Sequence, residues 1–146
     1  MGRRSRPHAK DTGAEDLIVA DSSAWVEFLR GTDHRVAIKL RELIERDEEI
    51  ALTEVIVMEL LAGARSGAGV RELRSRLLGF EVLPLQGLTD FEEAGVIYRA
   101  CRDAGETLRS LNDCLIAVPV IRAGASLLHN DADFTAIARH SSLKLA

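Results

Sequence analysis

The sequence has few aromatic residues and few cysteines. Aromatic residues make up 4% of the 146 residues, so stacking of bases on aromatic side chains can add little to any affinity for nucleic acid. Cys101 and Cys114 are too few and too far apart for a disulfide framework or a C-x-x-C metal site. Both lie in helical patterns, where we expect small buried side chains. Reduced cysteines of this kind indicate a cytoplasmic location.

Long apolar runs and an excess of positive charge are also missing. No stretch approaches the roughly 18 uninterrupted apolar residues of a membrane-spanning helix, so none is expected. With a net charge of −4, binding of nucleic acid would need a local basic patch or metal ions. Residues 1–16 have no apolar segment and are expected to form a disordered extension rather than a secretory signal. Residues 17–146 are expected to form one domain.

Short apolar runs alternate with longer amphipathic stretches along the chain. Strands are expected at 17–21, 50–52, 80–85, 126–129 and 143–145. Helices are expected at 22–31, 33–47, 54–65, 70–79, 89–104, 113–123 and 133–140. Two local details are also predicted: a capping box from Thr89 to Glu92 and a kink at Pro119. The alternation indicates an α/β fold, a three-layer sandwich around a mostly parallel sheet, because doubly buried strands read as continuous apolar runs.

Acidic residues occur at the carboxyl ends of two predicted strands and inside two apolar helices. Asp21 ends the first strand, and Asp131 and Asp133 follow the fourth. The crevice beyond the carboxyl ends of parallel strands is the usual functional site of such a sheet. Glu59 and Asp113 interrupt helical surfaces that are otherwise apolar.

Each of these acids has a structural explanation when it is considered alone. Turn residues, helix caps, first-turn acids and a glutamate that reaches the surface would account for them one by one. Taken together, five converging carboxylates would repel one another and bind protons unless a divalent cation neutralised them. A ligand set made only of oxygen favours Mg²⁺, with Mn²⁺ as a substitute.

Four motifs occur in a characteristic order between residues 17 and 139: "LIVADSSAWVEFLRG", "VIVMELLAGAR", "GETLRSLNDCLIAVPVIRAGA" and "LLHNDADFTAIAR". In this order they resemble the PIN-domain ribonucleases, specifically the VapC-type toxins of bacterial VapBC toxin–antitoxin systems. The resemblance implies a PIN-like sandwich in which Asp21, Glu59, Asp113 and Asp131 are the catalytic acids that bind metal. It implies that Asp133 is an additional metal ligand.

The same resemblance implies an activity and partners. The chain would be a Mg²⁺-dependent endoribonuclease toxin that cleaves structured RNA of the tRNA or rRNA class. It would be restrained by a VapB-type antitoxin and would form a homodimer and a toxin–antitoxin hetero-oligomer. The Ser22 hydroxyl would form a hydrogen bond within the site. Arg109, four residues before Asp113, is our candidate for an RNA phosphate contact, and a solvated loop arginine is the alternative.

Other functions explain the same residues less well. A Mg²⁺-dependent phosphatase usually needs D-x-D directly after the first strand, where this chain has "DSSAW". A receiver-type signalling domain would need further acids near the first strand and a lysine after a late strand, and "SLLHND" supplies no lysine. A PIN-fold module that binds RNA without cleaving it stays open, although all the expected acids are present.

Overall fold

The structure is a computed structural model that describes residues 16–146, so the predicted N-terminal extension lies outside the described residues except for Asp16. Over this part of the chain, five parallel strands form one sheet in the order β3-β2-β1-β4-β5. The strands are β1 Ile18–Ala20, β2 Ile50–Thr53, β3 Glu81–Leu83, β4 Ser126–Leu128 and β5 Lys144–Leu145. The predicted α/β class and the parallel sheet are therefore confirmed.

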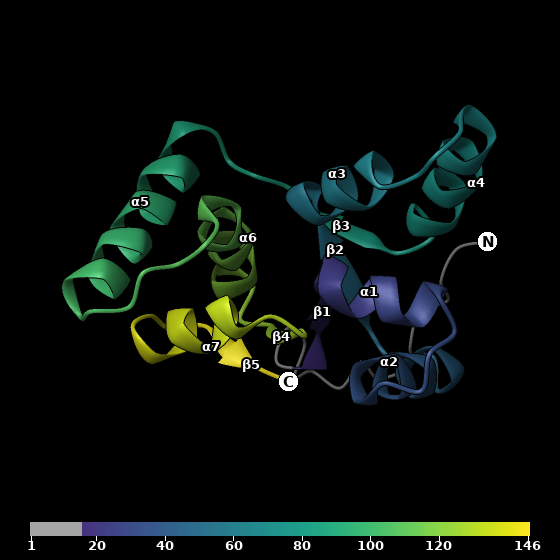
Figure 1. Cartoon of the computed structure of the whole chain (residues 1–146), viewed down its shortest axis with the longest axis horizontal. Helices are drawn as coiled ribbons and strands as arrows, with labels where there is room; N and C mark the ends of the chain where they lie inside the picture. Colours follow the sequence, from purple (N-terminus) through teal and green to yellow (C-terminus); the bar gives the residue numbers. More distant parts are fainter. Residues whose placement is uncertain (1–15) are drawn as a thin grey trace.

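The helices lie in two layers that cover the two faces of the sheet. They are α1 Ser22–Leu29, α2 Arg35–Glu45, α3 Glu54–Ala62, α4 Gly67–Leu77, α5 Leu88–Asp103, α6 Leu111–Arg122 and α7 Ala132–Arg139. Figure 1 shows α1 to α4 on one side of the sheet and α5 to α7 on the other. This division follows from right-handed crossovers, because the chain moves from β1 towards β3 and then returns past β1 to β4.

The core consists of the strands and the helix faces that pack on them. Val19, Leu52 and Leu127, one from each of the three central strands, are fully buried, as expected for strands covered on both faces. Phe134 and Ile116 bring α7 and α6 onto the sheet and are also fully buried. Within residues 16–146, no helix is long and apolar enough to cross a membrane.

The sheet order creates a switch point between β1 and β4. The chain leaves β1 towards β2 on one side, whereas β4 pairs with β1 on the other side, with Ala20 opposite Leu128. The Asp21 backbone N–H donates to the carbonyl oxygen of Leu128 at 2.9 Å. The loops that follow β1 and β4 therefore start side by side, and this is the position at which open α/β sheets bind ligands.

Some helix ends differ from the predictions. The expected capping box is wrong: α5 begins directly after Gly87, whose φ is +72°, no side chain caps it, and Thr89 lies inside the helix. The Asp90 carboxylate instead accepts the backbone N–H of Gln86 at 2.8 Å. Helix α4 begins three residues before the expected start, because the Ser66 hydroxyl caps it. Helix α6 continues through Pro119 to Arg122.

Candidate metal centre

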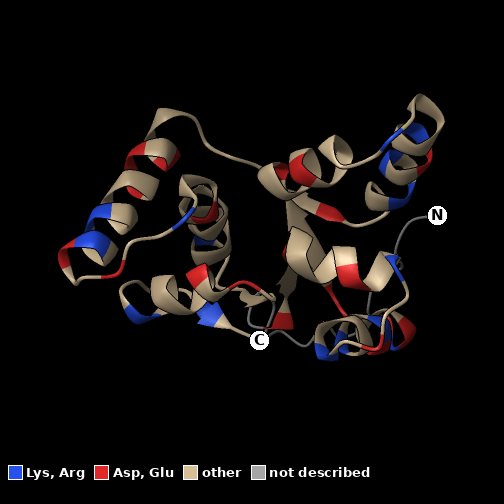
Figure 2. Cartoon of the chain, in the orientation of Figure 1, with Lys and Arg blue, Asp and Glu red and all other residues tan. Residues whose placement is uncertain are grey.

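The carboxyl ends of β1 and β4 open into a pocket of about 490 Å³ lined by acids from four segments of the chain. All five acids predicted from the sequence line it, together with Glu27 of α1, which the sequence analysis missed. Figure 2 shows acidic residues on α1, α3 and α6 and between β4 and α7, around the centre of the molecule. Arg109 is the single cationic side chain among the residues that line the pocket.

Asp21 lies at the junction of β1 and α1, where it caps the helix. Its Oδ2 accepts the backbone N–H of Ser23 at 3.0 Å and the Ser23 hydroxyl at 2.7 Å. Within residues 16–146, its Oδ1 is buried and has no hydrogen-bond partner, and the residue is 3% exposed. Burial raises the pKa of this carboxyl to about 6; the two Ser23 hydrogen bonds lower it, and the nearby Glu59 charge raises it further.

Glu59 reaches the same pocket from α3. The Thr53 hydroxyl caps this helix by accepting the Ile56 N–H at 3.3 Å, as the sequence predicted. Glu59 then lies in the second turn, on the side that faces α1. The Ser22 hydroxyl donates to Glu59 Oε1 at 2.8 Å, so the predicted hydrogen bond of Ser22 within the site exists, and its acceptor is Glu59.

Asp113 lies in the first turn of α6, behind the cap provided by Ser110, whose hydroxyl oxygen accepts the Asn112 N–H at 3.1 Å. The residue is 6% exposed, and its Oδ2 is buried without a hydrogen-bond partner in the part of the chain that the structure describes. Burial raises the pKa of the Asp113 carboxyl to about 8, and the charges of Asp131, Asp21 and Asp133 raise it further. Near neutral pH this carboxyl therefore holds its proton unless a cation approaches.

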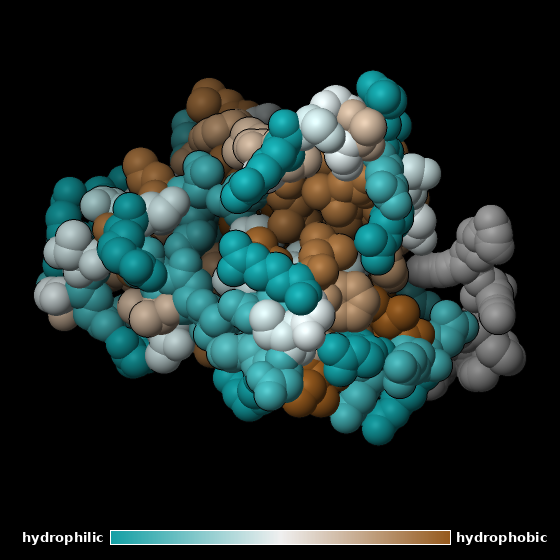
Figure 3. Space-filling view, turned by 45° about the vertical axis from the view of Figure 1, so that its right-hand side comes forward, coloured by the Kyte–Doolittle hydropathy of each residue, from teal (hydrophilic) through white to brown (hydrophobic). Residues whose placement is uncertain are grey.

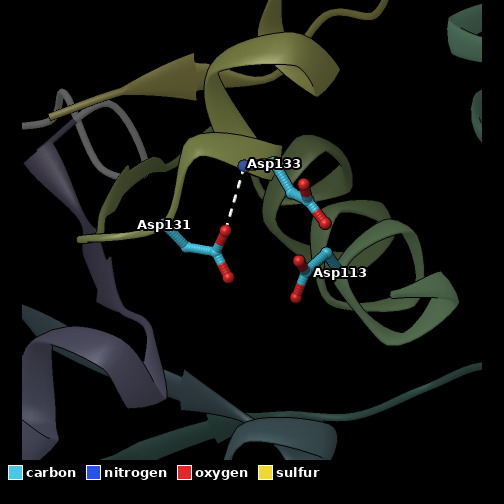
Figure 4. A group of neighbouring side chains, drawn as sticks. All are labelled: Asp113, Asp131 and Asp133. Carbon is cyan, nitrogen blue, oxygen red and sulfur yellow. Dashed lines mark hydrogen bonds between the residues drawn. The ribbon is translucent and has the colours of Figure 1, made fainter. Parts of the chain in front are cut away.

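Asp131 and Asp133 supply the third side of the pocket. Asp131 caps α7, and its Oδ1 accepts the Asp133 N–H at 3.0 Å. Asp133 lies inside the first turn of this helix and is 7% exposed. One carboxylate oxygen each of Asp113, Asp131 and Asp133 lies within 4.8 Å of the other two. Figure 4 shows these three carboxylates converging from α6 and from the start of α7.

This ligand set fits a hard divalent cation. Two buried carboxylate oxygens, Asp21 Oδ1 and Asp113 Oδ2, have no hydrogen-bond partner among the described residues, which costs free energy unless something binds them. The nitrogen and sulfur atoms nearby are less suited to binding the ion. His129 Nδ1 already accepts the Asp131 N–H at 3.1 Å. Burial raises the pKa of the Cys114 thiol to about 12. An all-oxygen set suits Mg²⁺ or Mn²⁺.

Arg109 lies at the rim of the pocket, in the loop between α5 and α6. Its Nη2 donates to Asp131 Oδ1 at 2.9 Å, and its Nε lies 3.7 Å from Asp133 Oδ1. Its backbone N–H donates to Asp133 Oδ2 at 2.9 Å. These carboxylates, Asp131 first, raise the pKa of the guanidinium. The residue predicted to contact phosphate is therefore paired with two of the acids.

Ser23 and Asn130 also line the pocket and were not predicted from the sequence. The Ser23 hydroxyl donates to Asp21 Oδ2 and accepts the Asn130 backbone N–H at 2.8 Å, which joins the loops after β1 and β4. Ser23 could have been predicted from the sequence, because it lies two residues after an aspartate that caps a helix. Asn130 acts through its backbone, so its residue type gave no signal.

Comparisons with known proteins agree with this geometry. The family model of the PIN domain matches residues 18–140. A VapC ribonuclease of Mycobacterium bovis and ribonuclease VapC11 of Mycobacterium tuberculosis are each 45% identical over 131 residues, which cover 89% of this chain and 98% of each relative.

Solved structures show the same fold at lower identity. VapBC-1 from nontypeable Haemophilus influenzae matches with a TM-score of 0.69 and 16% identity, over 89% of this chain and 96% of that one. VapBC2 from Rickettsia felis, bound to a promoter DNA fragment, matches with a TM-score of 0.68 and 20% identity, over 89% of this chain and 97% of that one. The resemblance noted in the sequence is thereby confirmed. The chain belongs to the PIN-domain family, in the group of the VapC proteins.

Proposed function

We propose that this chain is a Mg²⁺-dependent endoribonuclease, with Mn²⁺ as a substitute ion. The observation that carries the proposal is the pair of buried carboxylate oxygens without partners, Asp21 Oδ1 and Asp113 Oδ2, which line one pocket. The raised pKa values of these two acids, about 6 and about 8, support it, because a bound cation would offset the burial and the mutual repulsion of negative charge that a proton also relieves. The two relatives named as ribonucleases align with this chain over 98% of their own length.

The acids have separate roles in this proposal. Asp21, Glu59, Asp113 and Asp131 are the catalytic acids that hold the ion, with Asp133 as a further ligand. Ser23 and Ser22 fix the orientation of Asp21 and Glu59 through the hydrogen bonds described above. When bound, the ion would lower the pKa of the attacking water and polarise the phosphoryl oxygen.

The proposed substrate is structured RNA of the tRNA or rRNA class. Recognition by backbone and shape suits this chain, because it has few aromatic side chains for stacking bases. Arg109 at the pocket rim would contact the phosphate next to the scissile bond. The arginines of α4, seen in Figure 2, would follow the RNA backbone further away.

The proposed partner is a VapB-type antitoxin. Figure 3 shows apolar side chains gathered in a hollow on the side of the molecule that carries α1 to α4. These helices keep incompletely buried apolar side chains, among them Phe28 of α1, Met58 and Leu61 of α3 and Leu73 of α4. A partner segment with an apolar face would cover them. The solved structures described above are VapBC proteins, and a further similar structure, VapBC-5 from Mycobacterium tuberculosis, is described as a member of the VapBC family of toxin–antitoxin systems. A homodimer and a cytoplasmic location stay predictions.

The test is cleavage of a tRNA and rRNA pool by the purified chain. We expect cuts at few positions in Mg²⁺ or Mn²⁺, no cuts in EDTA, and a loss of at least about 100-fold in Asp21→Asn and Asp113→Asn. Asp103→Asn, which changes an exposed aspartate at the end of α5, is the matched control and should cut normally. RNA binding without cleavage by the wild type, or full activity of Asp113→Asn, would contradict the proposal.

The antitoxin is tested separately: the product of a short reading frame for a DNA-binding protein just upstream of this chain's gene is the candidate to add. We expect a stable complex and loss of RNA cleavage. Normal cleavage in the presence of a bound partner would refute restraint by that protein.

A further inference from the structure

The Arg109 side chain occupies the pocket without being buried in it. Its guanidinium donates to Asp131 Oδ1 at 2.9 Å and lies 3.7 Å from Asp133 Oδ1, yet the side chain is 75% exposed. The Asp131 side chain is 26% exposed. A contact of this kind between an exposed arginine and a partly exposed carboxylate is weak, about 0.2–1 kcal/mol, and can be exchanged for another.

The loop that carries Arg109 is held independently of this side chain. The Arg109 backbone N–H donates to Asp133 Oδ2 at 2.9 Å. Leu108, one residue earlier, is 5% exposed, and Ser110, one residue later, caps α6. The guanidinium can therefore leave Asp131 while the loop and Asp133 stay in place.

The charges in the pocket make such an exchange favourable when a cation arrives. Among the described residues, the lining holds six carboxylates and one guanidinium, and this positive charge pairs with Asp131, whose side chain is 26% exposed. A divalent cation among the same carboxylates would compete for Asp131 and repel the guanidinium. The displaced Arg109 guanidinium would then point into the opening of the pocket, where a phosphate group would lie.

We propose that Arg109 is an exchangeable cation in this site: it pairs with Asp131 when no ion is bound, yields Asp131 to the ion, and then binds the RNA phosphate. The inference rests on the proposed function, because it assigns a regulatory and positioning role within the same site. Its consequence is a pair of effects with opposite signs. Arg109 weakens ion binding to the free protein and strengthens binding of RNA to the loaded protein.

The test measures both effects in Arg109→Ala and Arg109→Gln. Mn²⁺ binding to the RNA-free protein is followed by the electron paramagnetic resonance signal of free Mn²⁺. We expect the Kd for Mn²⁺ to fall about two- to fivefold in both variants, which corresponds to the free energy of an exposed ion pair. At saturating Mn²⁺, we expect the KM for RNA to rise about tenfold with a smaller change in kcat, because a phosphate contact is lost.

Two further variants serve as controls. Arg109→Lys keeps the charge and should retain most of the competition with Mn²⁺, while losing the planar contact to phosphate. Arg102→Ala removes an arginine of α5 that pairs with Asp103 and should change neither quantity. Arg109→Gln is close in size to arginine, so a folded Gln variant keeps the test valid where the Ala variant is unstable.

The outcomes separate this inference from the proposed function. An unchanged or weaker Mn²⁺ affinity in both Arg109 variants, while the wild type binds Mn²⁺ and cuts RNA, would overturn the exchange and leave the proposed function standing. A higher Mn²⁺ affinity with unchanged RNA KM would refute the phosphate contact and with it the exchange as proposed. A wild type that binds no Mn²⁺ would refute both the proposed function and the inference.

Discussion

Replacing Asp113 by asparagine should stabilise the metal-free protein at alkaline pH, although the residue is buried. The folded protein raises the pKa of this carboxyl from an ordinary 3.8 to about 8. A carboxyl whose pKa is higher in the folded state binds its proton more tightly there. The free energy of unfolding therefore falls as pH rises from about 4. Above about pH 8, the ionised Asp113 carboxyl destabilises the folded protein by its full amount.

The size of the effect follows from that difference in pKa. About four pKa units at about 1.36 kcal/mol each give an upper bound of about 5 kcal/mol. Part of this free energy is repulsion that is shared with the neighbouring acids. An asparagine amide would also bring its own unmet hydrogen bonds, which cost about 1–3 kcal/mol. We expect Asp113→Asn in EDTA to gain about 2 kcal/mol in the free energy of unfolding at pH 8 and close to nothing at pH 5.

The measurement is urea unfolding followed by circular dichroism at both pH values. Asp90 provides the matched control, since it is also buried, at 1% exposed, but pairs with Arg122 at 2.7 and 2.8 Å, and that pair lowers its pKa. Asp90→Asn should lose about 3 kcal/mol, because it leaves a charged arginine without its partner. A loss of stability in Asp113→Asn at pH 8, similar to that of Asp90→Asn, would refute the reasoning.

Three other predictions test the site. Mg²⁺ at 100 times its Kd should raise the free energy of unfolding of the wild type by about 2.7 kcal/mol and that of Asp113→Asn by much less, as urea unfolding would show. The Kd for Mn²⁺ should rise at least about tenfold when the pH is lowered from 8 to 5.5. Asp21 and Asp113, with pKa values of about 6 and about 8, then take up protons that compete with the ion. A pH-independent Kd in calorimetric titrations would contradict this. Ser22→Ala should lower RNA cleavage about tenfold, since Glu59 loses its hydrogen bond, and should lower the free energy of unfolding by less than about 1 kcal/mol. Unchanged RNA cleavage would refute the role of Ser22 in orienting Glu59.

The sequence allowed the architecture and the convergence of the acids to be predicted, because both follow from local patterns. Apolar runs that end in Asp21 and before Asp131 placed these residues at the carboxyl ends of parallel strands. The fold then needed only the adjacency of β1 and β4 to bring the two loops together. A single resemblance covering four motifs supplied the roles predicted for Glu59 and Asp113.

The remaining features depend on contacts that no local pattern contains. Thr89 to Glu92 has the residue types of a capping box, but Asp90 is engaged by Arg122, 32 residues later, and the helix begins at a glycine with positive φ instead. The pairing of Arg109 with Asp131 joins residues 22 positions apart. Packing decides which carboxylate oxygens are buried without a hydrogen-bond partner among the described residues, so Oδ1 of Asp21 and Oδ2 of Asp113 could be identified only from the structure.

The most direct test of the account is the position of Mn²⁺ in crystals of this protein soaked at the concentration that supports RNA cleavage, located by anomalous scattering. We predict a peak among the carboxylates of Asp21, Asp113 and Asp131, and none there in crystals of Asp113→Asn. Active protein whose crystals show no peak in this pocket, or a peak only elsewhere, would contradict the assignment of the metal centre.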